Sequence, residues 1–163
     1  MVALVADTHM PKGARVVPDR CLELLRKAEL IVHAGDWWKL EVLEMLESIG
    51  PPVVGVHGNV DEPAVRRRLP ERAEFALGEH VVGVIHDAGA KRGRLRRMRK
   101  AFPDASAVIF GHSHIPLLET DPDAGFTIFN PGSPTDRRRA PAPTMGTLDL
   151  GGGGRLRFAH VEV

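Results

Sequence analysis

Short polar motifs, each placed directly after an apolar run, constrain this chain more than any other feature. Short apolar runs that end at turn-forming residues are typical of buried strands. Loops at strand ends are where a rigid scaffold most often carries binding and catalytic side chains. We therefore expect these motifs to meet in space. In chain order they are Asp7-Thr8-His9, Gly35-Asp36, Gly58-Asn59-Val60-Asp61, His86 and Gly111-His112-Ser113-His114.

The motifs supply the donor types that a pair of divalent cations requires. Two cations about 3.5–4 Å apart need several oxygen and imidazole donors directed at one point, and a short carboxylate that can bridge them. A set of carboxylates, one amide and imidazoles, without a thiolate, suits Mn²⁺, Zn²⁺ or Fe²⁺ better than Ca²⁺. We predict two divalent ions, with Mn²⁺ first and Zn²⁺, Fe²⁺ or Ni²⁺ as alternatives. The predicted ligands are Asp7, His9, Asp36, Asn59, His86, His112 and His114.

Length and composition favour one ordinary globular domain. The chain has 163 residues, of which 43% are hydrophobic, and this is within the range of a single domain with its own core. No stretch approaches the roughly 18 apolar residues of a membrane span, and the opening apolar run reaches Asp7 too soon for a signal peptide. We predict a single domain over residues 1–163, a cytoplasmic location and no membrane partner. The one cysteine, Cys21, is expected to be a buried, inert thiol.

Apolar runs alternate with helical patterns over the first two thirds of the chain. Strands are predicted at 2–6, 30–34 and 53–56, and helices at 21–29, 40–49 and 63–69. Such alternation favours βαβ units and a parallel sheet.

Shorter strands follow this alternating part of the chain. A hairpin at 73–85 turns at Gly78-Glu79, and strands are predicted at 107–110, 117–120 and 126–129. A last hairpin at 144–163 turns at the glycines 151–154, and we place it in a second, mostly antiparallel or mixed sheet.

A strongly basic segment precedes the strand at 107–110. Lys91–Lys100 holds seven basic residues in ten, while Leu95, Met98 and Phe102 recur at helical spacing. The pattern predicts an amphipathic helix with an exposed basic face. We favour a solvated face over a nucleic-acid surface because no aromatic side chains are interleaved to stack bases. A second basic cluster, Arg137-Arg138-Arg139, can lie nearer the predicted site.

Taken in order, these motifs resemble the signature of the calcineurin-like metallophosphoesterase superfamily. The spacing, the short chain and the turn Asn130-Pro131-Gly132-Ser133 are similar to its small prokaryotic phosphodiesterase branch, and the resemblance runs from Val2 to Ser133. It implies an α/β (α+β) sandwich in which two mixed β-sheets pack face to face and helices flank both outer faces, giving four layers.

The resemblance also implies a role for each donor. One ion would be held by Asp7, His9, Asp36 and His114, and the other by Asp36, Asn59, His86 and His112. Asp36 would bridge the ions. The implied reaction is hydrolysis of a phosphate ester by a metal-bridging hydroxide, with Asp36, Asn59 and His86 as catalytic residues. A phosphodiesterase is favoured over a phosphomonoesterase, and the implied partner is a small phosphate ester.

Three positions depart from the family pattern, and one of them is Met10, where a glycine often follows the Asp-x-His motif. Many members place a histidine directly after the asparagine, where it protonates the leaving group, but this chain has Val60 there. A site without that acid favours leaving groups that depart as stable anions. Asp87 stands where a glycine is more common; it is expected either to support a ligand or to cap the basic helix, and we rank the two equally.

Further residues are candidates for contacts around the ions. Asn59, Trp37 and Arg137 are predicted to contact the substrate, since an aromatic ring at the pocket mouth can stack on a base or an aryl group. Trp38 is expected to pack in the core instead. Besides Asp87, we predict that Asp61 and His33 hydrogen-bond to ligand loops and hold them in place.

Two other functions remain open from the sequence. The same superfamily includes subunits that use the fold mainly to dock partner proteins, and this chain can be such a module with little activity, although all its donor positions are filled. A nuclease or cyclic-nucleotide phosphodiesterase is the other alternative, differing only in substrate. The sequence does not decide whether the protein forms a homodimer.

Overall fold

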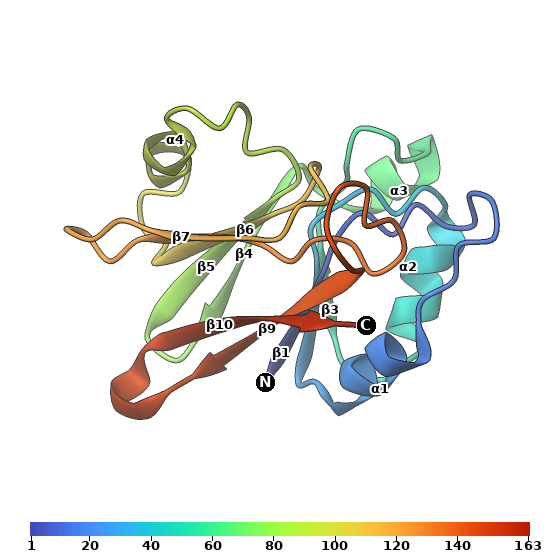
Figure 1. Cartoon of the computed structure of the whole chain (residues 1–163), viewed down its shortest axis with the longest axis horizontal. Helices are drawn as coiled ribbons and strands as arrows, with labels where there is room; N and C mark the ends of the chain where they lie inside the picture. The colour runs from blue at the N-terminus through green and yellow to red at the C-terminus, as the bar shows by residue number, and fades with distance from the viewer.

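The first of two five-stranded sheets contains both the beginning and the end of the chain. The computed structural model describes residues 1–163, and the strand order of this sheet is β10-β9-β1-β2-β3 (Figure 1). β1, β2 and β3 run parallel to one another, whereas β9 pairs antiparallel with β1 and β10 pairs antiparallel with β9. The strands are β1 (Val2–Val5), β2 (Leu30–His33), β3 (Val53–Gly55), β9 (Thr144–Leu150) and β10 (Leu156–Glu162).

The second sheet is also mixed and has the order β4-β5-β6-β8-β7. A hairpin joins β4 to β5, β6 lies parallel to both β5 and β8, and β7 is antiparallel to β8. The hairpin turns at Gly78-Glu79, which confirms the sequence prediction. The strands are β4 (Arg72–Leu77), β5 (His80–Ile85), β6 (Ala107–Phe110), β7 (Leu117–Thr120) and β8 (Thr127–Asn130).

Helices cover the outer faces of the two sheets. Figure 1 shows α1 and α2 on the outer side of the first sheet, with α3 beside α2, and α4 on the outer side of the second sheet. No helix is long and apolar enough to cross a membrane. The helices are α1 (Asp19–Lys27), α2 (Leu40–Glu47), α3 (Pro63–Arg68) and α4 (Arg94–Ala101), and a short 3₁₀ turn, η1 (Gly152–Gly154), links β9 to β10.

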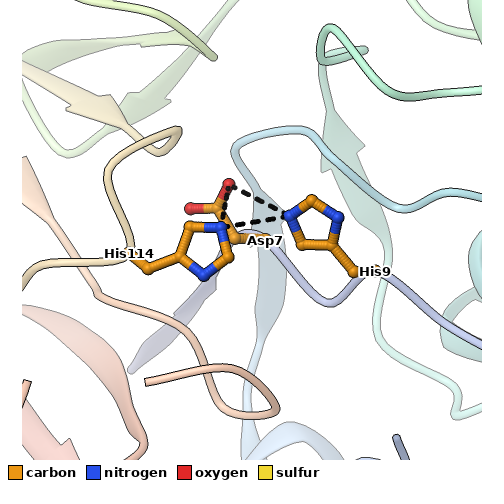
Figure 2. Close-up of side chains that lie close together, drawn as sticks. All are labelled: Asp7, His9 and His114. Atoms are coloured by element: carbon orange, nitrogen blue, oxygen red, sulfur yellow. Dashed lines mark hydrogen bonds and ion pairs between the residues drawn. The ribbon is translucent and has the colours of Figure 1, made fainter. Parts of the chain in front are cut away.

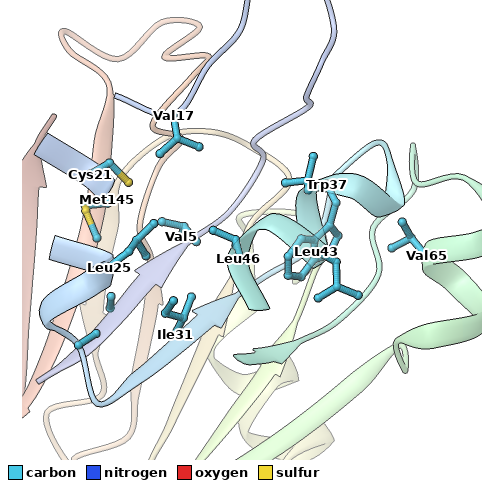
Figure 3. Packing of buried hydrophobic residues seen from close by; sticks show 13 residues of the cluster. Val5, Val17, Cys21, Leu25, Ile31, Trp37, Leu43, Leu46, Val65 and Met145 are labelled. Atoms are coloured by element: carbon cyan, nitrogen blue, oxygen red, sulfur yellow. The ribbon is translucent and has the colours of Figure 1, made fainter. Parts of the chain in front are cut away.

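Three apolar clusters fill the three spaces between these layers. Alternate side chains of β1 point in opposite directions, so that Val5 packs on the helices (Figure 3) and Leu4 packs between the sheets. Strand β6 behaves likewise: Ile109 lies between the sheets and Val108 faces Met98 of α4. Because the central strands are buried on both faces, they read as continuous apolar runs. The expected four-layer sandwich is confirmed.

The C-terminal hairpin differs from the prediction in its position. β9 and β10 pair as expected, but β9 joins the first sheet beside β1, with Val2 opposite Leu148, instead of the second sheet. β1 is wholly buried, and without β9 one of its edges would leave buried backbone groups unpaired. Apolar periodicity does not reveal this requirement, because it reports which faces of a strand are buried and not which strand lies next to it.

The basic segment forms α4, which begins at Arg94. Met98 and Phe102 are buried against the second sheet, and Leu95 is partly buried with them. The predicted apolar stripe and exposed basic face are therefore both present.

Candidate metal centre

The loops that follow β1, β2, β3, β5 and β6 meet at one end of the sandwich. Val5 of β1 lies opposite His33 of β2, and Ile85 of β5 lies opposite Phe110 of β6, so the parallel strands end together. The Asp7 N–H then donates to Gly35 O at 2.9 Å, which carries the pairing of the first two loops into the site.

Most of the predicted ligands have a left-handed backbone conformation. Outside glycine this conformation costs of order 1–3 kcal/mol, and it persists only where the surrounding structure enforces it. Such residues cluster at functional sites. The φ angles are +56° at Asp7, +46° at His9, +60° at Asp36, +68° at His112 and +60° at His114.

The turn that follows β8 hydrogen-bonds to two of the loops that carry these left-handed residues. Asn130 Nδ2 donates to Gly111 O at 2.7 Å, and Ser133 Oγ donates to Asp7 O at 2.8 Å. Across the same junction, the His112 N–H donates to Asp7 Oδ1 at 3.1 Å. These bonds fix the loop of the second sheet against that of the first, so Ser133 acts as an anchor, not as a nucleophile.

Asp7, His9 and His114 form one group of donors (Figure 2). The Nε2 atoms of His9 and His114 are 3.1 Å apart. Asp7 Oδ1 lies 3.6 Å from His114 Nε2 and 3.9 Å from His9 Nε2. His114 donates its Nδ1–H to Asp136 O at 2.7 Å. Its Nε2 therefore presents a lone pair to the group, as a metal ligand must.

Asp36, Asn59, His86 and His112 form the second group. His86 Nδ1–H donates to Ala34 O at 2.8 Å, which turns the Nε2 lone pair into the site. That Nε2 lies 3.3 Å from Asp36 Oδ1 and 3.1 Å from Asn59 Oδ1. His112 Nδ1 approaches the same Asn59 oxygen at 2.9 Å.

Asp36 lies between the two groups. Its Oδ2 is 3.4 Å from His9 Nε2 and its Oδ1 is 3.3 Å from His86 Nε2, so each oxygen faces a different group. Asp7 also groups with Asp36 and His86. The structure thus brings all seven predicted donors together, with Asp36 where a bridging carboxylate would have to be.

The electrostatics of the donors suit a cation. Burial raises the pKa of Asp7 to about 8, and its buried Oδ2 has no hydrogen-bond partner. Burial lowers the pKa of His9 to about 4 and holds that of His114 below its usual value. Burial alone would raise the pKa of Asp36, but its hydrogen bond with His86 and the charge of that ring bring it down to about 2. The neutral imidazoles of His9 and His114, the ionised carboxylate of Asp36 and the unpartnered buried oxygen of Asp7 fit divalent ions.

His33 and Asp61 support the loops. The buried His33 accepts the Gly35 N–H at Nδ1 (3.1 Å), so its Nε2–H donates to Thr8 Oγ1, also at 3.1 Å. Asp61 accepts the Trp38 N–H at 2.7 Å and the Gly58 N–H at 2.6 Å through its two oxygens. Both side chains therefore bind the backbone of the loops that carry the donors.

Other predicted positions are corrected by the structure. Trp37 is 0% exposed, donates Nε1–H to Val56 O at 2.8 Å and stacks on His33, so it cannot contact a substrate. Trp38, expected in the core, is only partly buried, and its ring centroid lies 6.3 Å from that of His9. The left-handed φ angles of Asp36 and Trp38 reverse the chain direction here. Helical periodicity does not predict which ring such a reversal turns inward.

Asp87 and Arg137 also have other roles than predicted. Asp87 is exposed and accepts the Gly89 N–H at 2.7 Å, closing a turn; it neither supports a ligand nor caps α4, whose N-cap is Gly93. Arg137 Nη1 donates to Ala140 O at 2.8 Å and stabilises its own loop. In a short exposed loop, such side chains hydrogen-bond to backbone atoms of the same loop. The sequence does not indicate which side chains will do so.

Residues that the sequence did not single out also shape the centre. Asp136 orients His114, as described above, and Arg66 donates to Asn59 O at 2.7 Å and to Asp61 O at 2.9 Å. Asp136 acts through its carbonyl, which any residue carries, and Arg66 lies in an ordinary basic helix. No sequence signal distinguishes either one.

Replacing Gly58 by alanine is expected to weaken metal binding by about 10–100-fold, the range for residues that orient ligands. A Cβ at this position would overlap Asp36 Oδ1 and its backbone nitrogen, so Asp36 must move. Titration calorimetry with Mn²⁺ measures the affinity. Gly152→Ala is the control, because nothing lies within 4 Å of its Cβ and its φ is not left-handed. Equal affinity of both variants would contradict the role given to Gly58.

Comparisons with known proteins agree with this geometry. Residues 1–153 match the family model described as the calcineurin-like phosphoesterase superfamily domain. A curated relative, the "Probable metallophosphoesterase" of Methanothermobacter thermautotrophicus, is 33% identical over 137 residues, which are 83% of this chain and 77% of the relative.

Solved structures share the fold. Thermotoga maritima protein TM1076 has a TM-score of 0.77 at 28% identity, covering 99% of this chain and 98% of its own. A structure described as a novel archaeal phosphodiesterase has a TM-score of 0.73 at 19% identity, covering 98% and 99%. Vps29 from Entamoeba histolytica, complexed with Zn²⁺, has a TM-score of 0.76 at 21% identity, covering 99% and 98%. On the family match and the curated relative together, the chain belongs to the calcineurin-like phosphoesterase superfamily.

Proposed function

We propose that this protein is a phosphoric ester hydrolase that uses two divalent metal ions and acts on phosphodiesters in preference to phosphomonoesters. The observation that carries the proposal is the convergence of seven donors in two adjoining groups, with the Asp36 carboxylate facing both. The archaeal structure described as a phosphodiesterase supports the choice of reaction, as a protein of the same fold.

The proposed ligand sets divide the donors between the ions. Asp7, His9, Asp36 and His114 would hold one ion, and Asp36, Asn59, His86 and His112 the other. Two divalent cations bound there would lower the pKa of a water molecule and would neutralise charge on the phosphoryl oxygens. Mn²⁺ is proposed first, with Zn²⁺, Fe²⁺ and Ni²⁺ as alternatives, because the donors are borderline in softness.

The exposure of each donor side chain indicates whether it would hold an ion or would face the substrate. Asp7, Asp36 and His114 are buried, so they are suited to fix the ions. Asn59 and His112 are exposed at the edge of the group, so a phosphoryl oxygen can approach them from solvent. Arg66 holds the Asn59 carbonyl and thereby fixes the amide that would contact the substrate.

The shape of the surface supports a diester. A hollow of about 340 Å³ opens beside His86 and Asn59, and a second of about 430 Å³ opens beside His112. A phosphodiester has two substituents on phosphorus, and one hollow is available for each. A phosphomonoester would leave one hollow empty.

The proposal is tested with chelator-treated protein to which Mn²⁺, Zn²⁺, Fe²⁺ or Ni²⁺ is returned separately. Hydrolysis of bis(4-nitrophenyl) phosphate is compared with that of 4-nitrophenyl phosphate. We expect cleavage only with metal, and faster cleavage of the diester. No hydrolysis with any metal, while calorimetry still shows two bound ions, would reject the enzyme and favour a protein-docking module. Faster monoester cleavage would overturn the diester preference.

Leaving groups should matter strongly in the wild-type protein. Val60 is 36% exposed beside Asn59 and offers no proton, so a substrate must expel its leaving group as an anion. For methyl aryl phosphates whose phenols differ in pKa, we expect kcat/KM to fall steeply as the phenol pKa rises.

A histidine at this position should reduce that dependence. Val60→His is expected to raise hydrolysis of the poorest leaving groups by at least about 10-fold, toward the general-acid contribution of about 10²–10⁴. Val16→His, at an exposed valine outside the site, is the control. Comparable wild-type rates with good and poor leaving groups would contradict the prediction.

A further inference from the structure

The loop between Ser133 and Ala140 places a strained arginine beside the candidate metal centre. The Asp136 N–H donates to Ser133 Oγ at 2.9 Å, and its carboxylate accepts from Arg15 Nη2 at 2.6 Å. Its carbonyl accepts from His114, so the loop is fixed on three sides. Two residues later, Arg138 has φ of +44°, in the left-handed region that the metal-site donors also occupy. The anchored loop thus enforces the position of Arg138.

Arg138 and Arg139 face a hollow that has no acidic wall. The hollow of about 430 Å³ is lined by these two arginines with His112, Ser113 and Ile115. Neither guanidinium makes a hydrogen bond or an ion pair with the protein, whereas Arg137 Nη1 donates to Ala140 O.

The hollow of about 340 Å³ beside His86 and Asn59 has a different charge. It is lined in part by Glu71 and Asp87, and its one arginine, Arg66, is engaged by the carbonyls of Asn59 and Asp61. A second anionic group on a substrate would be repelled there. It would be attracted by the free guanidinium groups of Arg138 and Arg139, since arginine binds phosphate with a planar pair of N–H donors.

We propose that the hollow lined by His112, Arg138 and Arg139 is a phosphate subsite, and that the preferred substrates are phosphodiesters in which one arm carries a second phosphate group. This inference rests on the proposed function, because it assigns one arm of the diester to this hollow. Arg138 is the specificity-determining residue: its guanidinium binds the second phosphate, and the uncharged arm lies in the hollow beside His86.

The test compares two substrates that differ only in the second phosphate: the 4-nitrophenyl ester of thymidine 5′-phosphate and the same ester phosphorylated on the 3′ oxygen. We expect wild-type kcat/KM to be about 10–100-fold higher for the second, the range for a hydrogen-bonded charge. Arg138→Gln should remove the preference, so that kcat/KM becomes equal for the two thymidine esters. Arg20→Gln, with the same charge change at an exposed arginine of α1, should keep the preference.

Equal loss on both substrates in Arg138→Gln, or no wild-type preference, would overturn the subsite. If no ester is cleaved with any metal, the proposed function fails, and binding then tests the subsite alone. By calorimetry with Mn²⁺, wild-type protein should bind adenosine 3′,5′-bisphosphate at least about 10-fold more tightly than adenosine 5′-phosphate. Arg138→Gln should bind the two equally. Equal affinities in the wild-type protein would reject the proposal.

Discussion

Replacing Asp36 by asparagine is expected to reduce phosphodiester hydrolysis by on the order of 10³-fold, a loss comparable to removal of a main electrostatic group from an active site. Each Asp36 oxygen faces a different donor group, at 3.4 Å from His9 Nε2 and 3.3 Å from His86 Nε2. Asparagine keeps the shape but loses the charge and one of the two acceptor oxygens, so it cannot hold two cations together.

Two measurements separate this role from a loss of folding. Titration calorimetry should show that Asp36→Asn binds fewer than two equivalents of Mn²⁺, while its circular dichroism spectrum is unchanged. Asp104→Asn, at an exposed carboxylate after α4, should keep wild-type activity and stoichiometry. Full activity in Asp36→Asn would rule out a bridging carboxylate at this position.

Asp7→Asn should stabilise the metal-free protein while it weakens metal binding. Asp7 is 0% exposed, and its Oδ2 has no hydrogen-bond partner, a situation that costs about 1–3 kcal/mol. The asparagine side chain carries no charge for burial to disfavour, and its Oδ1 can keep the bond from the His112 N–H. We expect the free energy of unfolding of chelator-treated protein to rise by about 1–3 kcal/mol, with a loss of Mn²⁺ affinity. A destabilised variant would contradict the argument.

The same carboxyl group should make metal-free stability depend on pH. The folded-state pKa of Asp7 is about 8 against an ordinary value of 3.8. Between these two pH values the folded protein therefore binds one more proton than the unfolded chain does. Stability falls as the pH rises toward 8. His9 has the opposite effect below pH 6.5: because its pKa is lowered to about 4, its contribution to stability increases as the pH rises toward 6.5.

The pH range from 6.5 to 8 therefore reports on Asp7, together with His86, whose raised pKa gives the same sign. Thermal unfolding of chelator-treated protein in this range should show a falling Tm. The fall should be smaller in Asp7→Asn. An identical slope in both proteins would show that Asp7 is ionised throughout, and the pKa argument would be wrong.

The structure brings the donors expected from the sequence close together because each lies in a loop that follows a strand. Asp7, Asp36 and His86 come after apolar runs that have only one reasonable structure, and parallel strands must end at the same edge. Periodicity also predicted the helices, including α4 with its apolar stripe.

Features that depend on tertiary packing could not be predicted from the sequence. The reversal at Asp36 buried Trp37 and left Trp38 beside His9, against expectation. Arg138, not Arg137, lies in the hollow beside His112, because the loop is fixed by bonds to residues far away in the chain. β9 lies next to β1 because the buried backbone groups on that edge of β1 need hydrogen-bond partners. No pattern within β9 itself indicates this position.

The first sheet supplies Asp7, His9, Asp36 and Asn59, whereas the second supplies His86, His112 and His114, so the donors lie on either side of the seam between the layers. Any ion held by both sides couples its affinity to the free energy with which the sheets pack. A cavity made in that packing, for example at Phe129, would then lower metal affinity without touching a ligand. The affinity of this centre is in that sense a property of the whole interlayer core.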